Sequence, residues 1–446
     1  MGTNRLTQGP IYSGIVKYFF PIFLGSLIQQ SYSIVDAIII GRYAGVYALA
    51  SIDATHNFTR LIIHIFMSTS LGGTIIIAQS FGARLYKKLS RISHILILMS
   101  LVGGIFFTLL GLILTPVFID IMKVPKDLIQ MSKAYLSIYF FGTTSMFVYN
   151  IGAGILRALG DSKRPFYILL ASSVLNVILD FILIAYFDLG VSGAAAATII
   201  AQTISSIIII RILRCNVIVA FSFLKIKVDL KIVKEVLKIG LPMGLQALTF
   251  VISNMMMQRA INTLGAIEVA GWAVVGKLDF VLWLIIDAAG ITVTTFVAQN
   301  LGAKRLDRIR KGNSFVFFFT SIIVISFSII LLTHVQYMTR LFTSDLQVIV
   351  MTSDMIWTIG PFYIFTCIAS LVSNILKGYG DTLKPMLITL ITTFSVRIIW
   401  VMIFTYNIKQ VLLAYPVTWT ITMGTIIAYV FIQRRINIIK ELKNIA

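Results

Sequence analysis

Charged residues are scarce in this chain: they make up 12% of its 446 residues, while hydrophobic residues make up 58%. A soluble globular protein carries about 25% charged residues, so the composition excludes that class. Apolar runs of about 20 residues, long enough to cross a bilayer as a helix, recur along the whole sequence. We therefore expect an all-α membrane protein with the lipid bilayer as its partner.

Cysteine and histidine are also rare, with two and four residues. The spacing of Cys215 and Cys367 does not indicate a disulfide framework. His56 and His64 have no supporting set of zinc ligands, so we expect no metal site. A phosphate loop ending in Gly-Lys-Ser/Thr is absent, which argues against ATP as the energy source and against any cofactor beyond a coupling ion. The Gly-x-Gly-Asp sequence at 378–381, a signature of intramembrane aspartyl proteases, lies at a predicted helix end, and we expect no enzymatic activity.

The chain has 17 acidic residues against 37 Lys and Arg, a formal charge of +20. Most of the basic residues fall in the N-terminal region, in every second predicted loop and in the C-terminal tail. The alternate loops hold only Arg42, Lys123, Lys126, Arg340 and Lys409. This is the positive-inside distribution of a multi-pass protein of the cell membrane, with both termini in the cytoplasm. Topology explains the surplus charge, so we expect no nucleic-acid partner.

Apolar segments predict twelve transmembrane helices, arranged as two pseudo-symmetric bundles of six. The segments lie near residues 15–41, 47–80, 90–114, 128–156, 165–186, 191–214, 236–262, 267–299, 313–333, 347–376, 384–405 and 410–433. The most basic stretch of the chain follows the sixth segment and is interpreted as a cytoplasmic connector. We predict an N-terminal lobe at 1–215, the connector at 216–235 and a C-terminal lobe at 236–446.

The two predicted lobes repeat one another in sequence. AQSFGAR at 78–84 recurs as AQNLGAK at 298–304, and ILRALGD at 155–161 recurs as ILKGYGD at 375–381, both 220 residues later. Six spans is an even number, so the two repeats insert the same way up and are related by an axis along the membrane normal. Repeats of this kind favour transport by alternating access over a symmetric pore.

Together these features resemble the multidrug and toxic compound extrusion (MATE) family over essentially the whole chain. The resemblance implies a cation-coupled antiporter that exports drug-like small molecules, and we expect it to be a monomer. The chain is most similar to the DinF-type branch, whose N-terminal polar cluster is matched here by Tyr32, Asp36, Asn176, Asp180 and Thr198. One departure is Ala153, where that branch has Asn. The acids of the sodium-coupled branch are missing, because residues 241–263 contain no acid and Thr366 stands at the aligned site on helix 10.

Asp36 is an acid among isoleucines in the first predicted membrane helix. Burying an unpaired carboxylate is costly, so an intramembrane acid marks a functional site by default, although a place near the membrane edge is the competing interpretation. Tyr32 and Asp36, like Asn176 and Asp180, are four residues apart and share a helix face. We predict that Asp36 and Asp180 form a coupled pair that exchanges a cation for cargo, with a proton favoured over sodium.

The second predicted helix carries polar residues at steps of three and four, from Asp53 to His64, which therefore lie along one face. Either these residues pair with one another, or they form a polar stripe that binds substrate in a central cleft. The second interpretation assigns substrate binding to His56, Arg60, His64, Arg259, Lys277 and Asp287. Asp279, two residues after Lys277, is predicted to pair with it. Because such a stripe is cationic, the alternative function is a flippase or exporter of an amphiphilic molecule, either anionic or lipid-linked.

Overall fold

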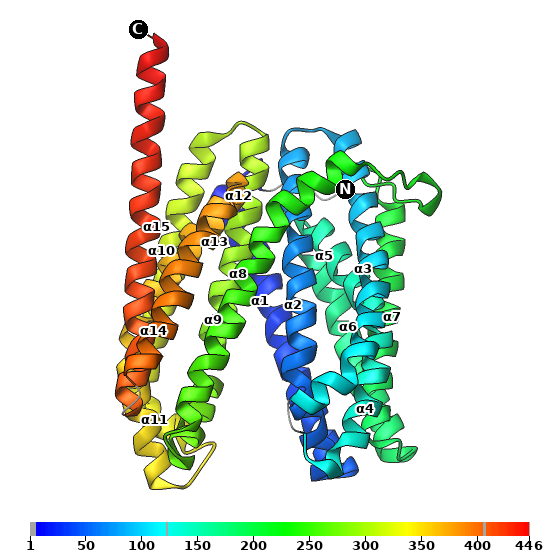
Figure 1. Cartoon of the computed structure of the whole chain (residues 1–446). Helices are drawn as coiled ribbons and strands as arrows, with labels where there is room; N and C mark the ends of the chain where they lie inside the picture. Colours follow the sequence, from blue (N-terminus) through cyan, green and yellow to red (C-terminus); the bar gives the residue numbers. More distant parts are fainter. Residues whose placement is uncertain (1–5, 122–123, 405–406, 446) are drawn as a thin grey trace. The chain divides into compact units, whose positions relative to one another are not determined.

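The computed structural model describes the backbone of residues 6–121, 124–404 and 407–445. It describes their side chains except at 56–58, 60–66, 69, 70, 121 and 434–445. Throughout this part of the chain, all regular structure is helical, as predicted (Figure 1). The chain divides into two compact units: unit 1 is Met1–Gly244 with Ala298–Arg308, and unit 2 is Leu245–Val297 with Ile309–Ala446. The lobe limits drawn from the sequence stay a prediction.

Unit 1 is built from helices of the first repeat, together with parts of three helices of the second. They are α1 (Ile11–Ile39), α2 (Val46–Gly82), α3 (Tyr86–Ile121), α4 (Lys126–Phe141), α5 (Thr143–Ala158), α6 (Lys163–Asp180), α7 (Gly190–Cys215), a short turn η3 (Phe223–Lys225) and the first part of α8 (Leu230–Asn262). Two π-helical turns, η1 (Ile40–Ala44) and η2 (Phe181–Tyr186), continue α1 and α6. Apolar side chains of α2, α3, α5 and α7 pack together in a hydrophobic core.

Unit 2 contains the rest of α8 and the helices that follow it. They are α9 (Ala266–Gly302, whose last residues belong to unit 1), α10 (Leu306–Thr339), α11 (Leu346–Ile359), α12 (Tyr363–Tyr379), α13 (Leu383–Thr389), α14 (Val396–Ile403) and α15 (Ile408–Ile445). The short turn η4 (Gly360–Phe362) joins α11 to α12. A third π-helical turn, η5 (Leu390–Ser395), joins α13 to α14.

Ten helical segments in the described residues are long and apolar enough to cross a membrane. They are Ile11–Ala44, Tyr86–Asp120, Lys163–Tyr186, Gly190–Cys215, Leu230–Asn262, Ala266–Gly302, Leu306–Thr339, Leu346–Tyr379, Leu383–Ile403 and Ile408–Gln433. The predicted spans at 47–80 and 128–156 are helical too, as α2 and as α4 with α5, but do not count among the ten. An all-helical membrane protein is therefore confirmed, and the number twelve stays a prediction.

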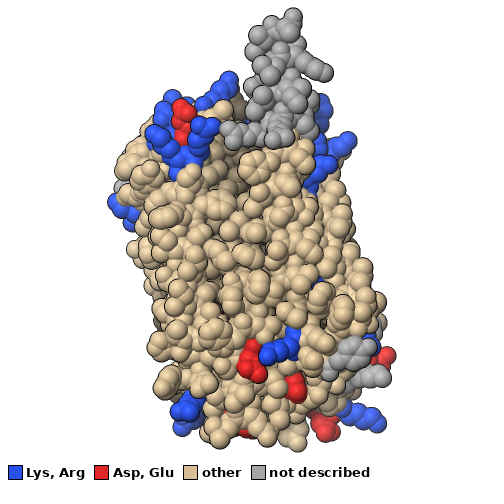
Figure 2. All heavy atoms as spheres, turned by 90° about the vertical axis from the view of Figure 1, so that its left-hand side faces the viewer, with Lys and Arg blue, Asp and Glu red and all other residues tan. Residues whose placement is uncertain are grey.

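The surface fits a lipid environment. On the face drawn in Figure 2, a broad band of side chains contains almost no Lys, Arg, Asp or Glu, and the charged residues gather at its two ends. Helices α3 and α10 show the same property, because apolar side chains such as Ile105, Phe106, Ile113 and Phe318 are more than half exposed. In water such exposure would be costly, whereas in a bilayer these side chains contact lipid tails.

Both copies of the first sequence motif end their helix with the same backbone conformation. Arg84 and Lys304, the last residues of the two copies, have left-handed φ angles of 58° and 56°. In each copy the next N–H then reaches back to a carbonyl five residues earlier, from Leu85 at 2.9 Å and from Arg305 at 2.8 Å. The repeat seen in the sequence is therefore also a repeat of structure.

The two copies of this motif also contact each other within unit 1. A Cβ atom at Gly82 would overlap the carbonyl oxygen of Gln299, and a Cβ atom at Gly302 would overlap that of Gln79. Each motif has an alanine four positions before its glycine, so a strip of small side chains faces the partner helix. This spacing of small residues allows two helix backbones to touch, and the ends of α2 and α9 do so reciprocally.

The second motif forms a left-handed glycine turn followed by a helix cap. Gly160 and Gly380 have φ angles of 87° and 93°. Asp161 Oδ1 accepts the backbone N–H groups of Lys163 and Arg164 at 3.2 and 3.1 Å, at the start of α6. Asp381 Oδ1 accepts an N–H group at the start of α13 in the same manner. The Gly-Asp pair in each motif therefore ends one helix and begins the next.

Removing one of these caps is expected to destabilise the protein measurably. Asp161→Ala leaves two N–H groups of α6 without their acceptor, which costs about 1 kcal/mol. Asp161→Asn keeps a side-chain oxygen at the same place and is expected to retain most of that stability. The midpoint of thermal unfolding of the purified protein in detergent would measure both changes. Equal midpoints for the Ala and Asn variants would contradict the capping role.

Candidate functional site

The polar cluster predicted for the N-terminal lobe lies on three helices of unit 1. Tyr32 and Asp36 are on α1, Asn176 and Asp180 on α6, and Thr198 on α7, and α6 packs against both of the other helices. Asp180 is fully buried and Asn176 nearly so, while Asp36 is half-buried. The carboxyl groups of Asp36 and Asp180 face each other within hydrogen-bonding range. The structure therefore brings together the two acids that the sequence suggests as a pair.

The polar atoms at the centre of this cluster are not satisfied by the described residues. One oxygen of Asp36, both carboxylate oxygens of Asp180 and both amide atoms of Asn176 are buried without a hydrogen-bond partner. Two ionised carboxylates only accept hydrogen bonds, so they repel and cannot bond to each other. One proton would let either acid donate to the other, and a small hard cation would be held by both. The arrangement is one that binds a positive ion.

Thr198 has a different role from the one expected of a direct neighbour. Its hydroxyl donates to the carbonyl oxygen of Ala194 in its own helix, at 3.1 Å, so it does not donate to either acid in this structure. Its oxygen lone pairs remain able to accept or to coordinate. Tyr32 is half-buried and lies within the electrostatic field of both Asp36 and Asp180.

Tyr135 on α4 belongs to the same cluster and was missed by sequence reasoning. Its hydroxyl interacts electrostatically with Asp36, Asp180 and Tyr32, and its ring stacks on Tyr139 with centroids 5.6 Å apart. The one signal for it is the pair of tyrosines four residues apart, which share a helix face. Periodicity alone does not say that this face turns toward the acids.

Both acid-bearing helices change to π-helical geometry next to the acids. Asp180 directly precedes η2, in which the N–H of Phe187 reaches the carbonyl of Ile182 at 3.0 Å. One helical turn after Asp36, η1 begins and closes with the N–H of Gly45 on the carbonyl of Ile40 at 3.1 Å. Such wide turns are rare and occur frequently at functional sites. Each acid therefore lies close to a π-helical turn.

The structure describes the side chains of three of the six predicted substrate-binding residues, namely Arg259, Lys277 and Asp287. The side chains of His56, Arg60 and His64 lie outside the described residues, so the stripe on α2 stays a prediction. Arg259 on α8 is exposed, and Lys277 on α9 is exposed with its ammonium 5.4 Å from the centre of the Phe342 ring.

Asp287 has a charged neighbour on a different helix. Its side chain on α9 is exposed, and the nearby charge is Lys377 on α12, which belongs to the second sequence motif. The two do not form an ion pair within 4 Å, since the ion pairs among the described side chains are Lys88–Glu235 and Arg164–Asp161. The two charges therefore interact at a longer distance than a direct ion pair.

The predicted pairing of Asp279 with Lys277 is wrong. Asp279 is buried, and its Oδ2 accepts the indole N–H of Trp283 at 3.1 Å and the hydroxyl of Tyr363 at 3.0 Å. Residues two positions apart on a helix point to opposite sides, so the side chains of Lys277 and Asp279 do not face each other. The aromatic cluster of unit 2 supplies the partners instead.

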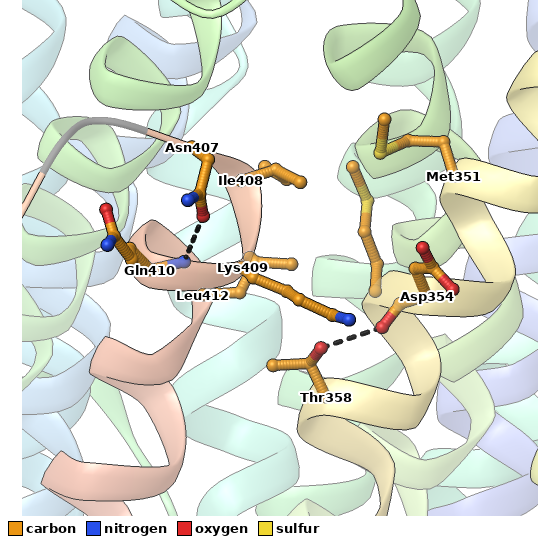
Figure 3. Close-up of a pocket in the computed structure, with 9 residues that line it drawn as sticks. Met351, Asp354, Thr358, Asn407, Ile408, Lys409, Gln410 and Leu412 are labelled. Carbon is orange, nitrogen blue, oxygen red and sulfur yellow. Dashed lines mark hydrogen bonds between the residues drawn. The ribbon is translucent and has the colours of Figure 1, made fainter.

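A cavity of about 280 Å³ opens in unit 2 between α11 and the start of α15 (Figure 3). Its wall combines apolar side chains with Asp354 and Lys409, which face the same space. The lining residues are Met351, Asp354, Met355, Thr358, Asn407, Ile408, Lys409, Gln410 and Leu412. None of the residues predicted to bind a cation or a substrate lines it, so this cavity is separate from the acid cluster.

Known proteins resemble the chain in sequence throughout. A family model described as MatE matches residues 21–182 and again 242–403. The probable multidrug resistance protein YpnP of Bacillus subtilis is 25% identical over 397 residues, which cover 89% of each chain. The probable multidrug resistance protein NorM of Thermotoga maritima is 25% identical, with 86% of this chain and 83% of that one covered. The multidrug export protein MepA of Staphylococcus saprophyticus is 24% identical, with 84% and 83% covered.

Solved structures share the fold. A MOP superfamily transporter from Pyrococcus furiosus superposes with a TM-score of 0.90, at 21% identity and with 99% of both chains covered. An outward-facing multidrug resistance transporter of the MATE family superposes with a TM-score of 0.89, also at 21% identity and 99% coverage of both chains. At this level of identity the likeness establishes the helical architecture alone.

Proposed function

Because this chain belongs to the MatE family of membrane transporters, we propose that it is a cation-coupled antiporter that exports drug-like organic compounds from the cytoplasm. Its curated relatives are named as multidrug resistance and export proteins, which places the chain among transporters and not enzymes. Drug export is favoured over the movement of a lipid-linked molecule because the relatives' names describe drugs. The finer assignment, to the DinF-type branch, rests on the polar cluster of unit 1.

One observation carries the proposal: the Asp36 and Asp180 carboxyl groups face each other, and among the described residues no hydrogen-bond donor reaches either oxygen of Asp180 or the buried oxygen of Asp36. Such a pair is stable with one positive ion bound and unfavourable without it. An antiporter needs a group of this kind, since cargo and ion must each be able to leave when the other binds. Both acids lie on helices that end in π-helical turns, which supports a coupling of ion binding to helix geometry.

A proton is favoured over sodium as the coupling ion. The carboxyl groups are already within hydrogen-bonding range, so a single proton joins them without further ligands. Sodium prefers several oxygen ligands, as other hard cations do. Within the residues that the structure describes, no group of three or more His, Cys, Asp and Glu gathers as a metal site.

We further propose the arrangement that such transport requires. Twelve helices cross the cell membrane in two six-helix bundles, with both termini in the cytoplasm, and a monomer alternates between outward and inward access. The positive-inside charge distribution and the sequence repeat support this arrangement. Protonation of the acid pair from outside releases cargo, and loss of the proton to the cytoplasm resets the site.

The test is a transport assay on the purified protein in lipid vesicles, with proton and sodium gradients imposed separately. A lipophilic organic cation and an organic anion serve as test compounds in parallel. We expect an imposed proton gradient to drive saturable movement of at least one compound. The sodium gradient alone should drive none. Movement driven by sodium alone would contradict the proton assignment. A flux that neither saturates nor responds to either gradient would contradict antiport and point to a channel.

A further inference from the structure

Arg397 on α14 is a buried cation that does not belong to the acid pair of unit 1. Its side chain is 2% exposed. Its Nη1 donates to Asn254 Oδ1 at 3.0 Å, and its Nη2 donates to the Thr418 hydroxyl at 3.3 Å. The guanidinium carbon lies over the ring of Tyr415, 4.4 Å from its centroid. All of these partners are neutral, so none of them balances the charge.

No acid balances this charge within ion-pair distance among the described side chains, whose ion pairs are Lys88–Glu235 and Arg164–Asp161. Asp279, which also acts on Tyr415, is already bonded to the aromatic donors described above. Arg397 Nε is buried without any partner. Because an unpaired cation in the interior is strongly disfavoured, a counter-charge is expected from outside the chain.

The position of Arg397 in the second repeat corresponds to the acid cluster of the first. The two matches of the family model are offset by 221 residues, from 21 to 242 and from 182 to 403, which aligns Arg397 with Asn176. Pro385 still keeps the motif offset of 220 from Pro165. The π-helical turn η5 lies between Pro385 and Arg397, and a π-helical turn accommodates one extra residue. Unit 2 therefore carries a permanent cation where unit 1 carries two acids and an amide.

The unpartnered Nε–H of Arg397 indicates the chemistry of the missing partner. Nε–H and the neighbouring N–H of a guanidinium form a planar fork that matches the two oxygens of a carboxylate. Trp272 and Trp419 each lie 5.5 Å from the Tyr415 ring, so the surroundings favour an apolar or aromatic body next to the charge. Asn254 is exposed, which places Arg397 one side chain below the accessible surface.

We propose that Arg397 binds the carboxylate group of an organic anion or zwitterion, with the aromatic side chains around Tyr415 packing against its apolar part. Unit 1 then takes the coupling cation, and unit 2 takes the acidic group of the ligand. Binding of the carboxylate to Arg397 does not depend on transport. Only the identification of this ligand as cargo rests on the proposed function.

Equilibrium binding to the purified full-length protein in detergent tests the assignment, by calorimetric titration with benzoate. Benzamide, which has the same shape without the charge, is the matched ligand control. We expect benzoate to bind at least tenfold more tightly than benzamide. We expect Arg397→Met to abolish benzoate binding and Arg397→Lys, which keeps the charge without the fork, to weaken it at least tenfold. Arg340→Met is the control variant, because Arg340 is an exposed arginine over a tyrosine ring, and it should leave binding unchanged.

Several outcomes would overturn the assignment: no binding of benzoate to the unchanged protein, equal binding of benzamide, or undiminished binding by the Arg397 variants. Should Arg397→Met fail to fold, Arg397→Lys carries the comparison, since it retains the buried charge. The unchanged protein could bind benzoate and yet show no gradient-driven transport. That result would contradict antiport but would support this binding site. The two proposals can therefore fail separately.

Discussion

Asp180→Asn is expected to reduce gradient-driven export in vesicles to the background of vesicles without protein. Asp180 is fully buried beside Asp36, and asparagine has nearly the same shape but cannot gain or lose a proton. Asp36→Asn removes the other half of the pair and is expected to have the same effect. The measurement is the initial rate of cargo movement under an imposed proton gradient.

The same substitution is expected to leave the fold intact or to make it more stable. An asparagine at 180 donates an N–H to the Asp36 carboxylate and ends the repulsion of two acids, a gain of about 1 kcal/mol or more. Thermal unfolding of the two proteins in detergent measures this gain. Loss of transport together with equal or higher stability separates a coupling role from a structural one.

Asp188→Asn is the matched control for this experiment. Asp188 is exposed just beyond η2, and its φ of 52° suits asparagine as well as aspartate. It should export at the rate of the unchanged protein. Full coupled export by Asp180→Asn would show that the pair in unit 1 does not carry the coupling ion.

The parts of the fold that could be predicted from the sequence are those set by local rules. Apolar segments of bilayer length predict the helices, and the two repeated motifs predict where helices end, because a left-handed residue and a capping acid act within one turn. The pairing of Asp36 with Asp180 was predicted from the resemblance to the DinF-type branch, because local rules place each acid on a helix face but do not show that α1 faces α6. The helices, their ends and their caps needed no knowledge of how one helix faces another.

The features that the sequence does not reveal depend on neighbouring helices. Tyr135 joins the acids because α4 turns that face inward, and Asp279 bonds to Trp283 and Tyr363 through the packing of unit 2. The π-helical turns leave the apolar pattern almost unchanged, since one wide turn shifts it by a single residue. Arg397 likewise finds its partners on other helices, Asn254 on α8 and Thr418 on α15.

Gly82→Ala is expected to prevent the protein from reaching its normal folded state. The new methyl group would occupy the position of the Gln299 carbonyl oxygen, and a backbone group cannot move aside as a flexible side chain can. Separating the ends of α2 and α9 loses the close contact between them, at a cost of about 3 kcal/mol or more. Thermal unfolding and the yield of monodisperse protein in detergent measure the loss.

Gly302→Ala should fail in the same way, because its methyl group meets the Gln79 carbonyl oxygen across the same contact. Gly276→Ala is the control on the same helix: nothing lies within 4 Å of its added Cβ. That variant should be neutral or more stable by up to about 1 kcal/mol, since alanine is the better helix former. A wild-type unfolding temperature for either motif variant would contradict the contact. Equal loss in both variants would show that the two glycines contribute equally to one reciprocal contact between the ends of α2 and α9.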